Sequence, residues 1–261
     1  MKKFIADWTV KEKTLFKEKE YCLLKLGLNE VIPEIFPGQF VQVRVDNSPN
    51  TFLRRPISIH YIDRSKNELW LLIQVIGDGT RKLSELKIND RLNLIYPLGN
   101  SFSLPEKTDK NSKFLMIGGG VGIAPFLYLG ALLQERGYKP EFLLGVKTKE
   151  DVLQIDEYRQ FGKFHITTED GSIGEKGFVT DHSILQSTDW DFIYTCGPRL
   201  MMVAVAKYAH ENGISCEVSL ENTMACGIGA CLCCVEKTTQ GNICVCTEGP
   251  VMNINQLTWQ I

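Results

Sequence analysis

Six cysteines near the end of the chain are the residues whose spacing most clearly specifies chemistry. Four residues separate Cys226 from Cys231, and two separate Cys231 from Cys234. This is the ligand spacing of a plant-type two-iron, two-sulfur cluster, which a later fourth cysteine completes. Cys244 and Cys246 are the candidates for that ligand. Spacing alone does not choose between them, because both would share one face of an extended strand.

Two glycines between the first ligands support the cluster. Gly227 and Gly229 can adopt positive φ at no side-chain cost and can aim backbone N–H groups at sulfur atoms. Zinc is the alternative metal, but the last two cysteines are only one residue apart and Cys226 would be unused. Free buried thiols are a third interpretation. The spacing favours the cluster.

The composition is that of an ordinary globular protein. The chain has 261 residues, of which 44% are hydrophobic and 23% charged, a length that suits two domains and a small appendage. A net charge of -2 predicts neither a nucleic-acid partner nor an anionic membrane surface. The apolar run at the amino terminus breaks at Asp7, so we expect no membrane span and no secretory signal. Nine cysteines in such a chain indicate a reducing compartment, and we expect the cytoplasm.

The first hundred residues are rich in short β-type runs broken by turn residues. Several strands at this spacing predict a small antiparallel barrel or sandwich. The predicted strands are Tyr21 to Leu28, Gln39 to Val45, Ile57 to Tyr61, Leu69 to Val75 and Arg91 to Ile95.

After Pro105 the pattern changes to apolar strands that alternate with helical or loop segments. This alternation predicts a doubly wound parallel sheet with helices on its faces. The predicted strands are Phe114 to Ile117, Phe142 to Val146, Phe164 to Thr168, Phe192 to Thr195 and Ser215 to Leu220, and the predicted helices run from Ala124 to Arg136 and from Arg199 to about Gly213.

Two glycine-rich turns are candidate phosphate sites. Residues 118–122 follow a strand and open a helix, which aims free N–H groups at an anion. Ile123 stands where the third glycine of the dinucleotide fingerprint would be, so a purely structural turn is the alternative. Residues 77–80, Gly-Asp-Gly-Thr, offer N–H groups and a hydroxyl to a pyrophosphate, or form an unliganded turn.

Two further segments have residue types suited to ligands. Arg55 stands three residues before Ser58, so one run could hold a phosphate and touch a ring system, although a surface arginine before an edge-strand proline is the alternative. Residues 196–198, Cys-Gly-Pro, follow a predicted strand, at the end where doubly wound sheets bind ligands. Cys196 could equally be a buried thiol.

In this order, the motifs resemble the electron transfer subunits of type B dihydroorotate dehydrogenase, within the ferredoxin reductase superfamily. The resemblance covers essentially the whole chain, and its most specific part is the cysteine region followed by Glu248-Gly249-Pro250. It implies three domains: an FAD-binding antiparallel β-barrel at residues 1–102, an NAD-binding parallel α/β domain at residues 103–218 and a small iron-sulfur domain at residues 219–261.

The resemblance also implies roles for individual residues. The fourth ligand precedes the Gly-Pro pair, which implies a [2Fe–2S] cluster on Cys226, Cys231, Cys234 and Cys246. The expected FAD site consists of Arg55, Pro56, Ile57, Ser58, Leu72, Ile73, Gln74, Gly79 and Thr80. The expected NAD(H) site consists of Gly118, Gly119, Gly120, Gly122, Cys196, Gly197 and Pro198. Ile57 departs from the superfamily, which usually has a flavin-stacking tyrosine there.

The implied function is electron transfer in the NAD-dependent oxidation of dihydroorotate, in pyrimidine biosynthesis. Electrons would pass from the FMN of a catalytic partner subunit through the cluster and FAD to NAD⁺, in a heterotetramer with two copies of each chain. Hydride carries an electron pair whereas a cluster takes one electron, so a flavin between them is required. No acid–base or nucleophilic constellation is needed, and we assign no catalytic residue.

Two alternatives remain. One is the small subunit of another NAD(P)H-dependent flavin and iron-sulfur oxidoreductase, of the ferredoxin or sulfide dehydrogenase type. The other is a zinc-stabilised binding module with no redox role.

Overall fold

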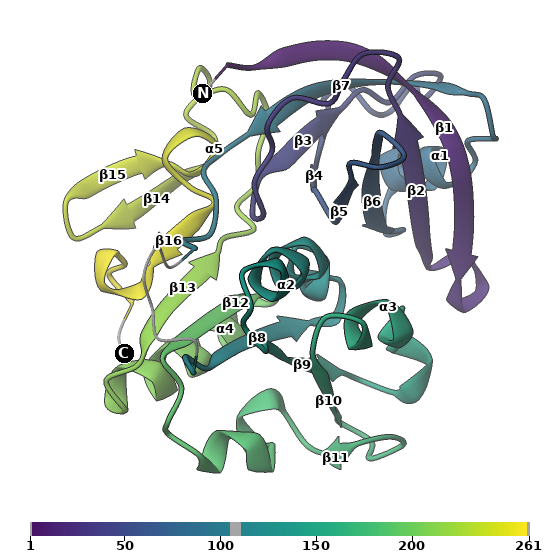
Figure 1. The fold of residues 1–261 in the computed structure, drawn as a ribbon. Coiled ribbons are helices and arrows are strands. Elements are labelled where there is room, and N and C mark those ends of the chain that lie inside the picture. The colour runs from purple at the N-terminus through teal and green to yellow at the C-terminus, as the bar shows by residue number, and fades with distance from the viewer. Residues whose placement is uncertain (1, 105–110, 260–261) are drawn as a thin grey trace. The chain divides into compact units, whose positions relative to one another are not determined.

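The computed structural model describes residues 2–104 and 111–259, and these form two compact units (Figure 1). One unit contains Met1–Ser101, Asn222–Glu236 and Ile243–Pro250. The other contains Phe102–Glu221, Lys237–Asn242 and Val251–Ile261. All six clustered cysteines therefore belong to the first unit, with the β-rich amino-terminal segment. The three-domain division stays a prediction.

The first unit is built on a seven-stranded antiparallel sheet. Its order is β4-β3-β7-β1-β2-β6-β5, and β4 also approaches β6, so the sheet curls into the predicted barrel. A short helix follows β6. The elements are β1 (Phe4–Phe16), β2 (Tyr21–Gly27), β3 (Phe40–Val43), β4 (Arg55–Ser58), β5 (Tyr61–Asp63), β6 (Glu68–Gln74), α1 (Asp78–Ser84) and β7 (Arg91–Leu98).

Strand β1 shows how alternation builds the barrel core. Trp8 and Val10 are fully buried, whereas Asp7 and Thr9, which alternate with them, are not. The indole of Trp8 meets Tyr96 of β7 edge to face, with ring centroids 5.0 Å apart. Removing such a buried aromatic costs about 3–5 kcal/mol, so Trp8 is a main support of the barrel.

Two strand predictions in this unit were incomplete. The single strand predicted from Ile57 to Tyr61 is wrong, because β4 ends at Ser58 and β5 begins at Tyr61. Ile59 and His60 lie in the break and are fully buried. The amino-terminal strand β1 was not predicted, although it is 13 residues long. Only two of its side chains are fully buried, so its hydrophobic pattern is weak.

The second unit is the predicted parallel α/β sheet. Its order is β11-β10-β9-β8-β12-β13-β16, parallel throughout except for β16, which pairs antiparallel with β13. The elements are β8 (Phe114–Gly119), α2 (Phe126–Glu135), β9 (Glu141–Val146), α3 (Ile155–Arg159), β10 (Lys163–Thr168), β11 (Glu175–Lys176), β12 (Phe192–Cys196), α4 (Arg199–Glu211), β13 (Ser215–Ser219) and β16 (Val251–Asn253).

The central strands β8 and β12 hold the core of this sheet. Phe114 of β8 stacks on Phe192 of β12, with ring centroids 5.4 Å apart. Helix α2 covers the sheet so closely that a Cβ on Gly130 would lie 2.4 Å from the ring of Phe142. The helix begins two residues later than predicted, because a 3-10 turn over Gly120–Ile123 comes first.

The strand order reverses at β8. The chain moves from β8 through β9 to β10 on one side, and then returns to place β12 and β13 on the other. The carboxyl ends of β8 and β12 therefore lie side by side at the switch point, which is where doubly wound sheets bind ligands.

The remaining elements follow β13. Strands β14 (Val235–Thr238) and β15 (Gly241–Cys244) form a two-stranded sheet, and α5 (Val245–Glu248) comes directly after it (Figure 1). No helix within residues 2–104 and 111–259 combines the length and the apolar character needed to cross a membrane.

Candidate functional site

The structure brings Arg55 and Gly79 together in the barrel unit. Arg55 begins β4, and Gly79 is the second residue of α1. A Cβ on Gly79 would lie 2.8 Å from Nε of Arg55 and 3.2 Å from Cγ2 of Thr51. Only glycine permits this approach, so the arginine packs directly on the helix backbone. The arrangement places a cation beside a helix start, a combination suited to a phosphate.

Thr80 has a structural part in the same helix. Its Oγ1 accepts hydrogen bonds from the N–H groups of Ile76 and Gly77, at 3.0 and 3.1 Å, and donates to the carbonyl of Gly77. The hydroxyl therefore holds the turn that presents Gly79. This function is independent of any ligand.

The predicted lining residues of β6 divide between two faces of the strand. Ile73 is fully buried and follows the alternation of the barrel core, whereas Leu72 and Gln74 face the other side. Nε2 of Gln74 donates to the hydroxyl of Tyr21 at 3.4 Å. On β4, Pro56, Ile57 and Ser58 are all half-buried, so this strand retains accessible surface.

The predicted nucleotide turn and the Cys-Gly-Pro segment meet at the switch point of the α/β sheet. Gly118 of β8 lies opposite Cys196 of β12 in the register. A Cβ on Gly122 would lie 2.4 Å from the carbonyl oxygen of Cys196, and a Cβ on Gly119 would lie 2.7 Å from Cδ of Pro198. Two segments far apart in sequence thus pack backbone against backbone.

The remaining glycines of this junction fit the same interpretation. Gly197 has φ +143, and its Cβ would lie 2.9 Å from the nitrogen of Gly119. Gly120 has φ +54 but meets nothing within 4 Å. One side of the turn is therefore closely packed and the other is open. An open backbone turn at a switch point suits a dinucleotide.

Cys196 is a neutral thiol. It is 1% exposed, and burial raises its pKa well above the ordinary value. Its Sγ donates to Oε1 of Glu221 at 3.7 Å, and desolvation raises the pKa of that carboxyl as well. Burial therefore opposes the charged form of both groups.

The cysteine segment aims backbone N–H groups at sulfur atoms. The N–H groups of Ile228 and Ala230 donate to Sγ of Cys226, at 3.4 and 3.3 Å. The N–H of Gly229 donates to Sγ of Cys246 at 3.2 Å. The positive φ of Gly227 and Gly229, +71 and +85, makes this curvature available. Both glycines therefore have the predicted positive φ, and Gly229 also directs its N–H at a sulfur.

Cys234 and Cys246 are the buried pair of this segment. The N–H of Cys246 donates to Sγ of Cys234 at 3.3 Å, and the two residues are 1–2% exposed. Burial and the neighbouring sulfur of Cys234 raise the pKa of Cys246 to about 12. Cys226 is the opposite case. Burial opposes its ionisation, but the N–H groups around its sulfur lower its pKa to about 6.

The remaining cysteines lie in different environments. Cys244 ends β15, and its N–H donates to Oε1 of Glu248 at 3.2 Å. Because Cys246 lies in α5, the two cysteines do not share one strand face. Cys231 and Cys233 are exposed, and Cys22 and Cys216 are buried core thiols. Among the described residues, no three cysteine, histidine or acidic side chains are arranged to hold a single metal ion.

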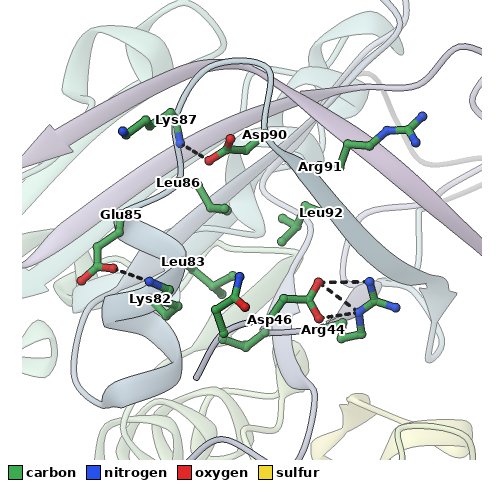
Figure 2. Close-up of a pocket in the computed structure, with 12 residues that line it drawn as sticks. Arg44, Asp46, Lys82, Leu83, Glu85, Leu86, Lys87, Asp90, Arg91 and Leu92 are labelled. Carbon is green, nitrogen blue, oxygen red and sulfur yellow. Dashed lines mark hydrogen bonds and ion pairs between the residues drawn. The ribbon is translucent and has the colours of Figure 1, made fainter. Parts of the chain in front are cut away.

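A pocket of about 540 Å³ in the barrel unit is lined in part by Lys82 and Leu83 of α1 (Figure 2). Two ion pairs lie within its lining: Lys82 bonds Glu85 at 2.9 Å, and Nε of Arg44 lies 2.8 Å from Oδ1 of Asp46. No predicted site residue lines it. The pocket therefore adds no binding group to the candidate site.

Two family models match the chain. The iron-sulfur cluster binding domain of dihydroorotate dehydrogenase B matches residues 221–258. The oxidoreductase NAD-binding domain matches residues 116–207.

Curated relatives match over most of their length. Dihydroorotate dehydrogenase B (NAD(+)), electron transfer subunit, from Shouchella clausii (strain KSM-K16) is 39% identical over 226 residues, which is 85% of this chain and 86% of the relative. The subunit of the same name from Fusobacterium nucleatum subsp. nucleatum is 38% identical over 253 residues, 95% of this chain and 96% of the relative.

Solved structures show the same fold. An NADH-dependent reduced ferredoxin-NADP oxidoreductase, described for flavin-based electron bifurcation, matches with a TM-score of 0.84 and 26% identity, over 97% of this chain and 90% of that chain. The ferredoxin reductase in carbazole 1,9a-dioxygenase matches with a TM-score of 0.69 and 21% identity, over 82% of this chain and 67% of that chain. The second likeness concerns the fold alone.

Proposed function

Because this chain belongs to the family of electron transfer subunits of dihydroorotate dehydrogenase B, we propose that it carries electrons between a catalytic partner and NAD. The predicted resemblance and the ferredoxin reductase-like fold are confirmed. The observation that best supports the proposal is the sulfur-directed loop of residues 226–230, in the same compact unit as the Arg55 and Gly79 junction. The same compact unit would thus bind both the cluster and the flavin phosphate.

The proposed route runs from the FMN of the partner through a [2Fe–2S] cluster and FAD to NAD⁺. When bound, FAD exchanges a hydride with the nicotinamide and single electrons with the cluster. The chain supplies binding, orientation and electrostatics for this exchange, and none of its groups needs to accept a substrate proton.

For the flavin, Arg55 supplies the charge and α1 supplies the N–H groups. Charge-assisted hydrogen bonds are roughly twice as strong as neutral ones, so the arginine dominates retention of the pyrophosphate. Thr80 acts by holding the turn that presents Gly79. The half-buried Ile57 and Ser58 contact the ring, and aliphatic contact replaces aromatic stacking at Ile57.

For NAD, the turn of residues 118–122 binds the pyrophosphate through backbone N–H groups. Its open side at Gly120 faces the ligand, and its packed side at Gly122 fixes the turn against Cys196. The neutral Cys196 thiol, followed by Gly197 and Pro198, lies beside the nicotinamide without attracting its charge.

For the cluster, the proposed ligands are Cys226, Cys231, Cys234 and Cys246. Cys226 and Cys246 already accept N–H donors from one loop, and Cys246 contacts Cys234 through its own N–H. The N–H of Cys244 instead bonds Glu248. The donor set of soft thiolates with backbone N–H groups suits an iron-sulfur cluster.

The proposed partner is the FMN-containing catalytic subunit, in a heterotetramer with two copies of each chain. Ile228 and Leu232 beside the ligands are 46% and 66% exposed, which suits a docking surface close to the cluster. All nine cysteines lie in described residues and are free thiols, in agreement with a reducing compartment, which we propose is the cytoplasm.

The pathway assignment is tested by reconstitution. The isolated chain should pass electrons from NADH to an artificial dye but should not oxidise dihydroorotate, because residues 2–104 and 111–259 form no barrel of eight strand-helix units that would bind FMN. Adding the FMN-containing dihydroorotate dehydrogenase subunit of the same cell should restore dihydroorotate-dependent NAD reduction. If the two loaded proteins form no complex and remain inactive, the pathway assignment is wrong.

A second candidate is favoured by the likeness to the ferredoxin-NADP oxidoreductase structure. In that case the loaded chain would exchange electrons with ferredoxin and not with the dihydroorotate-oxidising subunit. A visible spectrum of the purified protein separates both from a zinc-stabilised module, because flavin and cluster absorb and zinc does not.

A further inference from the structure

Gln42 is a buried carboxamide whose polar atoms have no partner in the described structure. It lies on β3 and is fully buried, and neither its Nε2 nor its Oε1 makes a hydrogen bond. Leaving such a group unpaired costs about 1–3 kcal/mol. Buried amides are normally satisfied, so this one calls for an explanation.

Gln39, three residues earlier, shows the normal arrangement. It is also fully buried, but its Oε1 accepts the N–H of Phe36 at 2.8 Å and its Nε2 donates to the carbonyl of Gly99 at 3.1 Å. Gln39 is therefore a structural brace. Two carboxamides on one short segment differ only in whether the protein itself satisfies them.

The unpaired amide lies against the cysteine segment. Val41 and Val43 alternate with Gln42 and belong to the barrel core, so Gln42 faces the opposite side of the strand. A Cβ on Gly227 would lie 2.5 Å from Cγ and 2.8 Å from Nε2 of Gln42. Gly227 directly follows the proposed ligand Cys226, and both segments belong to the same compact unit.

The backbone of Gln42 is held in place on the strand. Its carbonyl accepts Nη1 of Arg54 at 3.2 Å, and Arg54 also donates to the carbonyl of Asn93. The barrel therefore fixes the backbone from which the carboxamide projects, independently of the cysteine loop. A fixed N–H donor beside a sulfur-binding loop can act on the cluster without reorganisation.

We propose that Gln42 is a positioning residue for the [2Fe–2S] cluster, an inference that rests on the proposed function. Its Nε2 donates to the sulfur atoms held by the Cys226 loop. Reduction adds an electron whose charge spreads over these sulfurs, so an N–H donor stabilises the reduced form more than the oxidised one. Gln42 therefore raises the reduction potential of the cluster.

The test is a redox titration of the loaded wild-type protein and three variants, followed by visible absorption and electron paramagnetic resonance. Gln42→Met keeps the length of the side chain and removes both polar atoms. We expect it to shift the one-electron reduction equilibrium about tenfold toward the oxidised cluster, which is about 59 mV for one electron. The flavin potential should stay unchanged.

Gln39→Met is the matched control, because it also removes a buried carboxamide from the same segment. It should lower the unfolding temperature and leave the cluster potential unchanged. Gln42→Asn, which withdraws the amide by one methylene, should shift the potential in the same direction by less and serves if the methionine variant fails to fold.

Unchanged potentials in both Gln42 variants, or an equal shift in Gln39→Met, would overturn the proposal. A wild-type protein that holds no cluster would instead remove the proposed function on which it rests. The two failures are therefore distinguishable in one experiment.

Discussion

The proposed nucleotide turn and the cysteine loop would each bind a cofactor, but with different parts of the chain. At residues 118–122 the proposed binding surface is backbone, and its shape is set by glycines that touch the opposite segment at Cys196 and Gly197. At residues 226–234 the proposed binding groups are side-chain sulfurs, and backbone N–H groups of the loop point at Sγ of Cys226 and Cys246.

This difference predicts how each region responds to substitution. A backbone site tolerates no added atom on its packed side, whereas its chemistry does not depend on any one side chain. A side-chain site fails when one ligand is lost, even if the fold is intact.

The largest effect should come from the fourth ligand. Cys246→Ser should abolish the cluster signal in electron paramagnetic resonance of the reduced protein, because Cys246 is buried and accepts a loop N–H. Cys244→Ser should leave the signal unchanged, because the loop N–H of Gly229 is directed at the sulfur of Cys246. The reverse result would show that Cys244 is the ligand.

The next largest effect should come from a substitution on the packed side of the proposed nucleotide turn. Gly122→Ala would place a Cβ 2.4 Å from the carbonyl of Cys196, and such overpacking typically costs about 1–3 kcal/mol. NADH-dependent dye reduction should fall by about tenfold, with cluster and flavin spectra unchanged. Gly213→Asn is the control, because its φ is +67 and nothing lies within 4 Å. Equal loss in both variants would contradict a specific role for the turn.

Flavin retention should distinguish the charged group of Arg55, which would bind the phosphate, from Thr80, which holds the turn. Arg55→Ala should release more flavin during purification than Thr80→Ala, because a charge-assisted contact is lost. Thr80→Ser should restore retention, because a hydroxyl can still accept the N–H groups of Ile76 and Gly77. Arg44, paired with Asp46, is the control arginine. Full flavin occupancy in both alanine variants would refute the assignment.

The smallest effect should be a pH dependence of stability in the α/β unit. Burial lowers the pKa of His182 below 6.5, although Glu175 raises it and His165 lowers it further. A depressed histidine pKa means that the unfolded chain binds the proton first. The unfolding temperature should therefore fall as the pH drops below 6.5, and His182→Gln should reduce this slope. The exposed His210, changed to Gln, should leave the slope unchanged.

Much of the α/β unit could be predicted from the sequence. Strands β8, β9, β10 and β12 lie within one or two residues of their predicted limits, because each is an apolar run with glycine or polar residues at its end. The turn at residues 118–122 and the segment at residues 196–198 were both recognised. Their contact through Gly122 was not predictable, since it depends on which strands become neighbours.

The barrel unit was harder to predict. Strand β1 buries only Trp8 and Val10 completely, and α1 buries only Gly79 and Leu83, so neither shows a strong periodic pattern. Gln42 gave no signal at all. A glutamine in a strand normally faces solvent, and only its packing on Gly227 distinguishes it.

The pairing of β13 with β16 bears on how the protein matures. Glu217 lies opposite Asn253, so residues 220–250, with every proposed cluster ligand, form a loop that leaves one edge of the sheet and returns to it. During synthesis, every parallel strand of that sheet is complete before the first ligand cysteine is made. We therefore expect the nucleotide sheet to form without waiting for iron, and the cluster to be inserted late. Iron starvation would then leave a chain that has folded around NAD but cannot pass electrons onward.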